Sequence, residues 1–229
     1  MLDLRAPLLP PDQGERLVRE AYKRDFRLRD AQIRDGASWK LERRQHFQEQ
    51  GSASWEAMRR GDWEESLRLL EERRPALLEA ARADERRGYV FHRVRIVQNP
   101  LTPYMQWQLH SLRLRAECGE MIRVVRLEEV SVSDNPDPLP EVVILGGHTL
   151  YRVLYDEAGV PGGAVRYTAP ETVTRWELYV KALHRAGEEV RSFFDREVAP
   201  LPPPEVTGQQ GTPAPALPAN AQASTAETE

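Results

Sequence analysis

The segment that decides the fold runs from Tyr89 to Val125 and reads YVFHRVRIVQNPLTPYMQWQLHSLRLRAECGEMIRVV. Its first nine residues alternate in side-chain character, which predicts a strand. Thr102 is suited to cap a helix, and Pro103 to occupy the first helical position. Gly119 is a typical helix stop, and a second apolar run follows it. The segment therefore predicts a strand, a helix and another strand in succession.

The flanking segments supply further elements. Upstream, residues 39–47 alternate as a strand would, and residues 54–87 have a helical pattern with two breaks. Downstream, residues 141–167 hold three short apolar runs separated by glycine-containing turns, which predicts an antiparallel meander. Residues 171–186 follow as an amphipathic helix. We therefore expect an α/β (α+β) fold: a mixed, largely antiparallel sheet flanked by helices, with a C-terminal β-meander and helix.

The chain divides into three parts. Residues 1–36 alternate acidic and basic side chains and predict a charged, helical N-terminal appendage. Residues 37–199 are expected to form a single α/β domain. Residues 200–229 are rich in Pro, Ala, Thr and Gln, and such a segment cannot bury enough apolar surface to offset its ordering entropy. We predict that it is a disordered tail.

Composition argues against several classes of protein. The 229 residues carry a formal net charge of −4, whereas general nucleic-acid binding normally needs a basic excess, so direct nucleic-acid binding is not expected. Cys118 is the only cysteine, which permits no internal disulfide and fits a reducing cytosol. No run approaches the roughly 18 apolar residues of a membrane helix. The expected location is cytoplasmic, without a membrane partner.

The sequence contains no recognisable catalytic motif. Its five histidines are scattered and none has a metal-binding spacing, so we predict no metal site. GxSxG, GxxxxGK and GxGxxG motifs are absent, and we predict no catalytic residues and no cofactor. Between Arg86 and Arg126, eight arginines against two glutamates give a local charge of +6. These arginines form salt bridges with glutamates of the helix at residues 62–87, or they form a face for phosphate or an acidic partner.

Two polar side chains of the central helix fall outside its polar face. At about 100° per residue, Gln108 and Arg115 lie between two apolar stripes, whereas Gln106 and His110 lie on the polar face. Burial of an unpaired guanidinium is strongly unfavourable. Arg115 is therefore satisfied internally, by a carboxylate or by carbonyl groups, or the two side chains line a cleft for an anionic ligand. Structural networks outnumber binding sites, which favours internal pairing.

If the cleft exists, five residues form the candidate ligand site: Arg95, Tyr104, Trp107, Gln108 and Arg115. Arg115 would supply charge and a forked donor, and Gln108 would orient the ligand. Tyr104 and Trp107 would form an aromatic wall.

The run VRIVQNPLTPYMQWQLHSLRLRAECGEMIRVV resembles an actinobacterial family, the domain of unknown function 6879 family. Members of that family show a basic strand, a proline-containing turn into Tyr-x-Arg-aromatic-Glu, and then Ala-Gly-Glu-x-Val/Ile-Arg. The similarity covers about residues 39–198. The matching positions are Arg95, Val97, Pro100, Leu101, Tyr104, Trp107, Gly119, Glu120, Ile122 and Arg123.

The sequence departs from this family where chemistry would be expected. Gln106 and Gln108 stand where the family commonly has Arg and Glu, and Arg115 stands where it often has Asn. Glutamine cannot accept a proton, so the resemblance implies binding more than catalysis. Family members are often encoded beside helix-turn-helix regulators, which implies a regulatory protein partner of that type by association.

We therefore predict a non-enzymatic cytoplasmic regulatory or interaction module that binds a protein partner or a small anionic ligand. The alternative is an enzyme acting on a phosphate-containing or nucleic-acid substrate, whose charge the arginines would hold.

Overall fold

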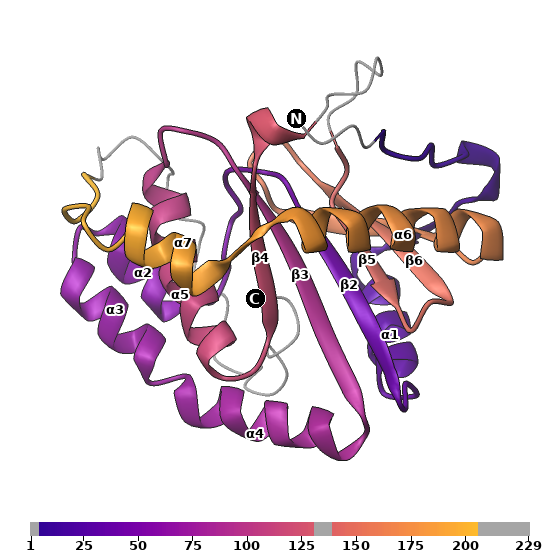
Figure 1. Cartoon of the computed structure of the whole chain (residues 1–229), viewed down its shortest axis with the longest axis horizontal. Helices are drawn as coiled ribbons and strands as arrows, with labels where there is room; N and C mark the ends of the chain where they lie inside the picture. Colours follow the sequence, from indigo (N-terminus) through magenta and orange to yellow (C-terminus); the bar gives the residue numbers. More distant parts are fainter. Residues whose placement is uncertain (1–4, 131–138, 206–229) are drawn as a thin grey trace.

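The computed structural model describes residues 5–130 and 139–205, so most of the predicted tail, residues 206–229, lies outside the described residues. A sheet runs through the molecule with helices on both of its faces (Figure 1). None of the helices in the described ranges is long and apolar enough to span a membrane. The elements are, in chain order, η1 (Pro11–Gln13), β1 (Glu15–Val18), α1 (Arg19–Asp30), β2 (Gly36–Glu42), α2 (Ala53–Arg59), α3 (Trp63–Glu71), α4 (Arg74–Arg86), β3 (Tyr89–Val97), α5 (Pro103–Glu117), β4 (Met121–Arg126), η2 (Leu127–Glu129), β5 (Val142–Leu145), β6 (Thr149–Tyr155), β7 (Pro161–Tyr167), α6 (Pro170–Ala186), β8 (Glu188–Glu189) and α7 (Val190–Glu197).

The strands of the described ranges form one eight-stranded sheet in the order β1-β7-β6-β5-β2-β3-β4-β8. Strands β2, β3 and β4 are parallel neighbours, and every other adjacent pair is antiparallel. The predicted mixed, largely antiparallel sheet flanked by helices is confirmed. The meander β5–β6–β7 and the helix that follows it are also where the sequence predicts them.

The central strand–helix–strand unit forms as its local signals predict. The Thr102 side chain accepts a hydrogen bond from the Met105 amide, and Pro103 lies in the first turn of α5. Gly119, at the end of this helix, has a φ of +115°, a left-handed conformation that favours glycine. The chain then enters β4 at Met121, and both β3 and β4 lie in the interior of the sheet.

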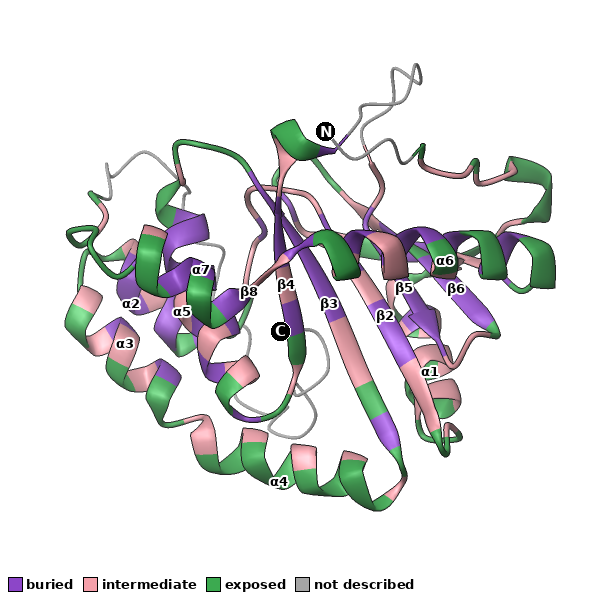
Figure 2. Cartoon of the chain, viewed as in Figure 1, coloured by how far each residue is buried: buried purple, intermediate pink, exposed green. Residues whose placement is uncertain are grey.

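The polar face predicted for α5 is wrong over the first part of the helix, where other elements cover it, whereas Glu117 at its end is exposed. Gln106 is only 6% exposed and donates a hydrogen bond to the Pro202 carbonyl at 2.7 Å. His110 is half-buried between the rings of Trp63 and Phe194, with ring centroids 5.1 and 4.7 Å away. Helices α3 and α7 therefore enclose the side of α5 that the sequence pattern assigns to solvent (Figure 2).

The N-terminal helix predicted from alternating charges is present as α1, and it is built onto the sheet. Strand β1 pairs with β7 at the sheet edge. Helix α1 packs Tyr22 against Tyr151 of β6, with ring centroids 5.1 Å apart. The domain boundary predicted at residue 36 stays a prediction, but the strand before it belongs to the same sheet as the rest.

The two faces of the sheet are packed differently. Helix α6 covers one face over a single apolar cluster that includes Leu41, Val94 and Ile96. On the other face, one apolar cluster lies under α2, α3, α5 and α7, and a second lies under α1. Charged side chains of β2 and β3 lie between these two clusters.

Candidate functional site: a buried polar network beneath helix α5

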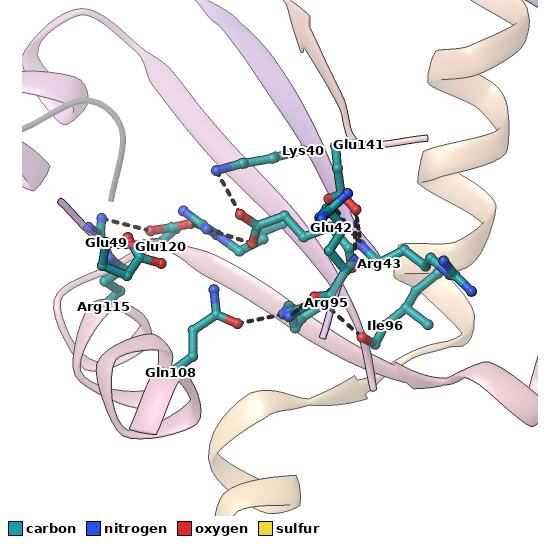
Figure 3. A network of polar contacts seen from close by, with 12 residues as sticks. Lys40, Glu42, Arg43, Glu49, Arg95, Ile96, Gln108, Arg115, Glu120 and Glu141 are labelled. Carbon is teal, nitrogen blue, oxygen red and sulfur yellow. Dashed lines mark hydrogen bonds and ion pairs between the residues drawn. The ribbon is translucent and has the colours of Figure 1, made fainter. Parts of the chain in front are cut away.

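Register brings four charged side chains together on this second face. Lys40 lies opposite Arg93 and Glu42 lies opposite Arg95 in the parallel pairing of β2 with β3. Side chains two apart in a strand point to the same face, so all four project toward α5. We call these four residues, together with Gln108, Arg115 and Glu120, the buried polar network (Figure 3).

Arg93 is the centre of the ionic part of the network. Its guanidinium contacts Glu42 at 2.8 Å and Glu120 at 2.6 Å, and Lys40 contacts Glu42 at 2.8 Å. Burial alone would raise the pKa of Glu42, but the charges of Arg93 and Lys40 outweigh it and hold that pKa well below its usual range. The sequence favours salt bridges from Arg93 to glutamates of the helix at residues 62–87, and this prediction is wrong. The partners of Arg93 lie in β2 and in the turn before β4.

Arg95 is held mostly by uncharged oxygens. It is fully buried, and its Nε donates to Gln108 Oε1 at 2.7 Å. Its Nη1 donates to the carbonyls of Glu42 at 3.0 Å and Ile96 at 3.1 Å, and its Nη2 donates to the Arg44 carbonyl. The guanidinium thereby ties the end of β2 to β3 and α5. These contacts give Arg95 a positioning role within the fold.

Gln108 belongs to the buried polar network and also lines a cavity. It is 7% exposed, and its carbonyl oxygen is occupied by Arg95. Its amide nitrogen donates no hydrogen bond to any residue that the structure describes, and the side chain lines a cavity. A donor without a protein acceptor at the wall of a cavity is available to an acceptor that enters it.

The sequence leaves two alternatives open for Arg115, internal pairing or a cleft for an anionic ligand, and Arg115 has features of both. Its guanidinium lies 3.6 Å from Glu120, and the side chain is 10% exposed. It also lines the same cavity as Gln108. The two residues are therefore brought to one place, with Arg115 paired to a carboxylate of the chain.

The two aromatic residues of the candidate site have separate positions. The Tyr104 hydroxyl donates to Glu49 Oε1 at 2.5 Å, and burial raises the pKa of Tyr104 well above its ordinary value. Trp107 donates from its indole nitrogen to Ser54 Oγ at 2.9 Å and borders the cavity. Of the predicted aromatic wall, Trp107 reaches the cavity, whereas Tyr104 is not among its lining residues.

The cavity, called the α5 cavity here, has a volume of about 50 Å³ and is partly open to solvent. One water needs roughly 10–15 Å³ in the same measure, so the space admits several waters or one small polyatomic group. Its lining holds four cationic side chains and two carboxylates, and Glu120, just outside the lining, contacts two of these cations, so the cations exceed the adjacent carboxylates by one. The charged and polar lining residues are Lys40, Arg73, Arg93, Arg115, Glu42, Glu49, Gln48, Gln108 and Ser111.

A second buried carboxylate, Glu141, adjoins the network. Its oxygens accept hydrogen bonds from the amides of Arg43 at 3.1 Å and Arg44 at 2.7 Å. Burial nevertheless raises the pKa of Glu141 to about 7, because it outweighs these hydrogen bonds and the charge of Arg95. Glu141 thus titrates near neutrality while supporting the backbone that Arg95 contacts.

Sequence reasoning missed Lys40, Glu42, Glu120 and Glu141. The alternation of residues 39–47 carries a signal for the first two, since it places both on one face of a predicted strand. That face reads as solvated unless β2 is known to lie in the middle of the sheet with helices on both sides. No local pattern marks Glu120 or Glu141, because Arg93, the spatially nearer partner of Glu120, is 27 residues distant and the partners of Glu141 are 97–98 residues distant in sequence.

No group of three or more His, Cys, Asp or Glu residues placed to hold a metal ion occurs in residues 5–130 and 139–205.

Comparison with known proteins identifies a family. The model of the family described as domain of unknown function (DUF6879) matches residues 25–195, a range that includes the whole buried polar network and the α5 cavity. The resemblance expected from the central segment is thereby confirmed. No curated protein matches the chain.

Proposed function

The chain belongs to the DUF6879 family, and we propose that this protein binds one small anionic group, such as a carboxylate or a phosphate, in the α5 cavity. The observation that carries the proposal is Gln108, a cavity-lining side chain whose oxygen accepts from Arg95 and whose amide nitrogen has no acceptor among the described residues. An acceptor atom of a ligand would satisfy it.

The charge of the lining supports an anion over a neutral acceptor. Lys40 and Arg115 both line the cavity; Lys40 contacts Glu42 at 2.8 Å, and Arg115 lies 3.6 Å from Glu120. A partly open, low-dielectric space strengthens the attraction between such cations and an entering anion. The volume of about 50 Å³ limits the bound group to a few heavy atoms, so a larger ligand would insert only its acidic end.

Binding fits the residues better than proton-transfer catalysis. Glu42, the carboxylate held by Arg93 and Lys40, has a pKa well below its usual range and is a poor proton acceptor. Gln108 cannot accept a proton. If the resemblance is followed, the family's usual glutamate at this position would pair with Arg95, and the change to glutamine supplies the free donor.

We also propose that the protein is a cytoplasmic regulatory module. Support comes from Cys118, a buried free thiol of the kind found in reducing compartments. The resemblance also implies an association with helix-turn-helix regulators, and a regulatory protein partner would fit it.

The test is calorimetric titration of the protein with inorganic phosphate and with acetate. The variant is Gln108→Glu, which keeps an acceptor for Arg95 but replaces the cavity-facing donor by a negative charge. We expect it to weaken anion binding by at least about tenfold, equivalent to about 1.4 kcal/mol. Gln106→Glu is the matched control, because Gln106 lies on the same helix and contacts the Pro202 carbonyl instead of the cavity.

Equal affinities of the Gln108→Glu variant and the unmodified protein for both anions would contradict the proposal. So would an absence of binding to either anion by the unmodified protein. Circular dichroism of each variant shows whether the fold is retained.

A further inference from the structure

The lining of the α5 cavity changes from charged to apolar along the sheet. Its cationic residues Lys40 and Arg93 lie on β2 and β3. Its residues Tyr155 and Pro161 pair with each other across β6 and β7. In the order of the sheet, β6 and β7 lie on the opposite side of β2 from β3. A ligand in the cavity therefore meets positive charge on one side and apolar surface on the other.

The apolar side is built of aromatic and aliphatic side chains. The rings of Phe47 and Tyr155 have centroids 4.9 Å apart. Pro161 adjoins them, and Trp107 and Leu112 of α5 complete the apolar lining. Such a surface favours a hydrocarbon group, because the contact removes apolar area of both from water. An inorganic anion would leave this side of the cavity unused.

Two neighbouring side chains of α5 offer hydrogen-bond donors at the cavity wall. The amide nitrogen of Gln108 and the hydroxyl group of Ser111 have no acceptor among the described residues. Side chains three residues apart are neighbours on one side of a helix. The two donors match a carboxylate, which accepts hydrogen bonds at both of its oxygens.

The charge of the lining suits a carboxylate better than a phosphate. Its four cations exceed its two carboxylates and the adjoining Glu120 by one. A carboxylate carries one negative charge near neutral pH, whereas a phosphomonoester carries about 1.5–2. Phosphate sites commonly use free backbone amides at a helix N-terminus. The residues of α5 that line this cavity, within 107–115, lie beyond its first turn, so their amides bond within the helix.

On the basis of the proposed function, we propose that the anion bound in the α5 cavity is a short aliphatic monocarboxylate. Its carboxylate accepts hydrogen bonds from Gln108 and Ser111, and its hydrocarbon chain lies toward Tyr155 and Pro161. The cavity volume is about 50 Å³. That space corresponds to roughly three to five waters, which an acid of about two to four carbon atoms would replace.

The experiment is calorimetric titration of the full chain with acetate, propionate, butyrate and inorganic phosphate, in a buffer free of other carboxylates and phosphates. Propionamide, which has nearly the shape of propionate without its charge, is the control ligand. We expect the affinity to rise about fourfold with each added methylene group. Butyrate should bind more tightly than phosphate, and propionamide should bind at least about tenfold more weakly than propionate.

Two matched variants locate the hydrocarbon chain. Pro161→Glu places a negative charge on the apolar side of the cavity, and Pro170→Glu makes the same change at an exposed position at the start of α6. We expect Pro161→Glu to weaken butyrate binding by at least about tenfold and Pro170→Glu to leave it unchanged. Circular dichroism shows whether each variant is folded, and the ligand series on the unmodified protein is decisive without them.

Three results would overturn the monocarboxylate while leaving the proposed function standing: tighter binding of phosphate than of butyrate, equal affinities for acetate and butyrate, or equal effects of the two folded variants on butyrate binding. Equal affinities for propionate and propionamide, or no binding of any of the four anions, would overturn both.

Discussion

Two arginine-rich regions of this protein differ in how their charges are compensated. In the buried polar network, Arg93 lies within 2.8 Å of both Glu42 and Glu120, because β2 and the turn before β4 bring those carboxylates to it. On the outer side of α1, Arg24 and Arg27 are exposed and form no ion pair with a described residue, whereas Asp25 of the same helix contacts the sheet.

The difference shows that charge alternation along a sequence does not decide where charges pair. Strand register determines the partners of Arg93, whereas Arg24 lies on the outer side of α1 and forms no ion pair with a described residue. A cation in the interior needs a partner for the fold to be stable, whereas a cation on the surface can stay solvated. Substitutions in the first region should therefore reduce stability, and substitutions in the second should leave it almost unchanged.

The largest effect should follow Arg93→Met. Removal of this guanidinium leaves two carboxylates, those of Glu42 and Glu120, without their main buried partner, and breaking a buried ion pair in this way costs about 3–5 kcal/mol. Urea denaturation measures the loss in the free energy of unfolding. Arg82→Met on α4, an exposed helix (Figure 2), is the control and should change it by less than about 0.5 kcal/mol. Similar losses in the free energy of unfolding for the two variants would contradict the expected difference between buried and surface arginines.

Glu141 should make stability depend on pH. Its pKa in the folded state is about 7, raised by burial above the ordinary value of 4.5. A carboxyl group whose folded pKa is raised contributes stability that is present below pH 4.5 and lost as the pH rises through about 7. A shift of this size corresponds to about 3 kcal/mol, at about 1.4 kcal/mol per pH unit.

The measurement is the free energy of unfolding between pH 4.5 and 8, for the unmodified protein and for Glu141→Gln. Glutamine does not titrate, so the difference between the two profiles isolates this carboxyl group from the other titrating residues. A pH-independent difference would show that Glu141 has its ordinary pKa in the fold, and that its hydrogen bonds to the Arg43 and Arg44 amides outweigh burial.

Much of the fold could be predicted from the sequence because its signals are local. The cap at Thr102, the stop at Gly119 and the turn between β5 and β6 each depend on a few neighbouring residues. The covering of α5 by α7 depends on contacts distant in sequence, and the solvated face assigned to Gln106 is wrong for that reason.

The candidate site shows the same limit. Helical periodicity identifies Gln108 and Arg115 as unusual polar residues on an apolar side of α5, and both line the α5 cavity. The partners that decide their chemistry, Arg95 for the one and Glu120 for the other, depend on strand order and on the path of the turn. No periodic pattern contains that information.

A smaller effect on stability is expected for Gln108→Leu. The substitution keeps similar volume but removes the oxygen that accepts from Arg95 Nε, and a buried donor left without a partner costs about 1–3 kcal/mol. Thermal and urea denaturation should agree on this loss. Gln108→Glu should be the more stable of the two variants, because a carboxylate can still accept from Arg95. If the leucine variant is as stable as the unmodified protein, the contact does not contribute to the fold.

The smallest effect on stability should come from Arg24→Ala combined with Arg27→Ala. Neither guanidinium has a carboxylate partner among the described residues, so their removal should change the free energy of unfolding by less than about 0.5 kcal/mol. Added salt should reduce even this change, because it screens repulsion between the neighbouring cations of α1. A loss well above about 1 kcal/mol in urea denaturation would mean that these arginines are compensated within the fold after all. The outer side of α1 would then resemble the buried polar network in how its charges are compensated.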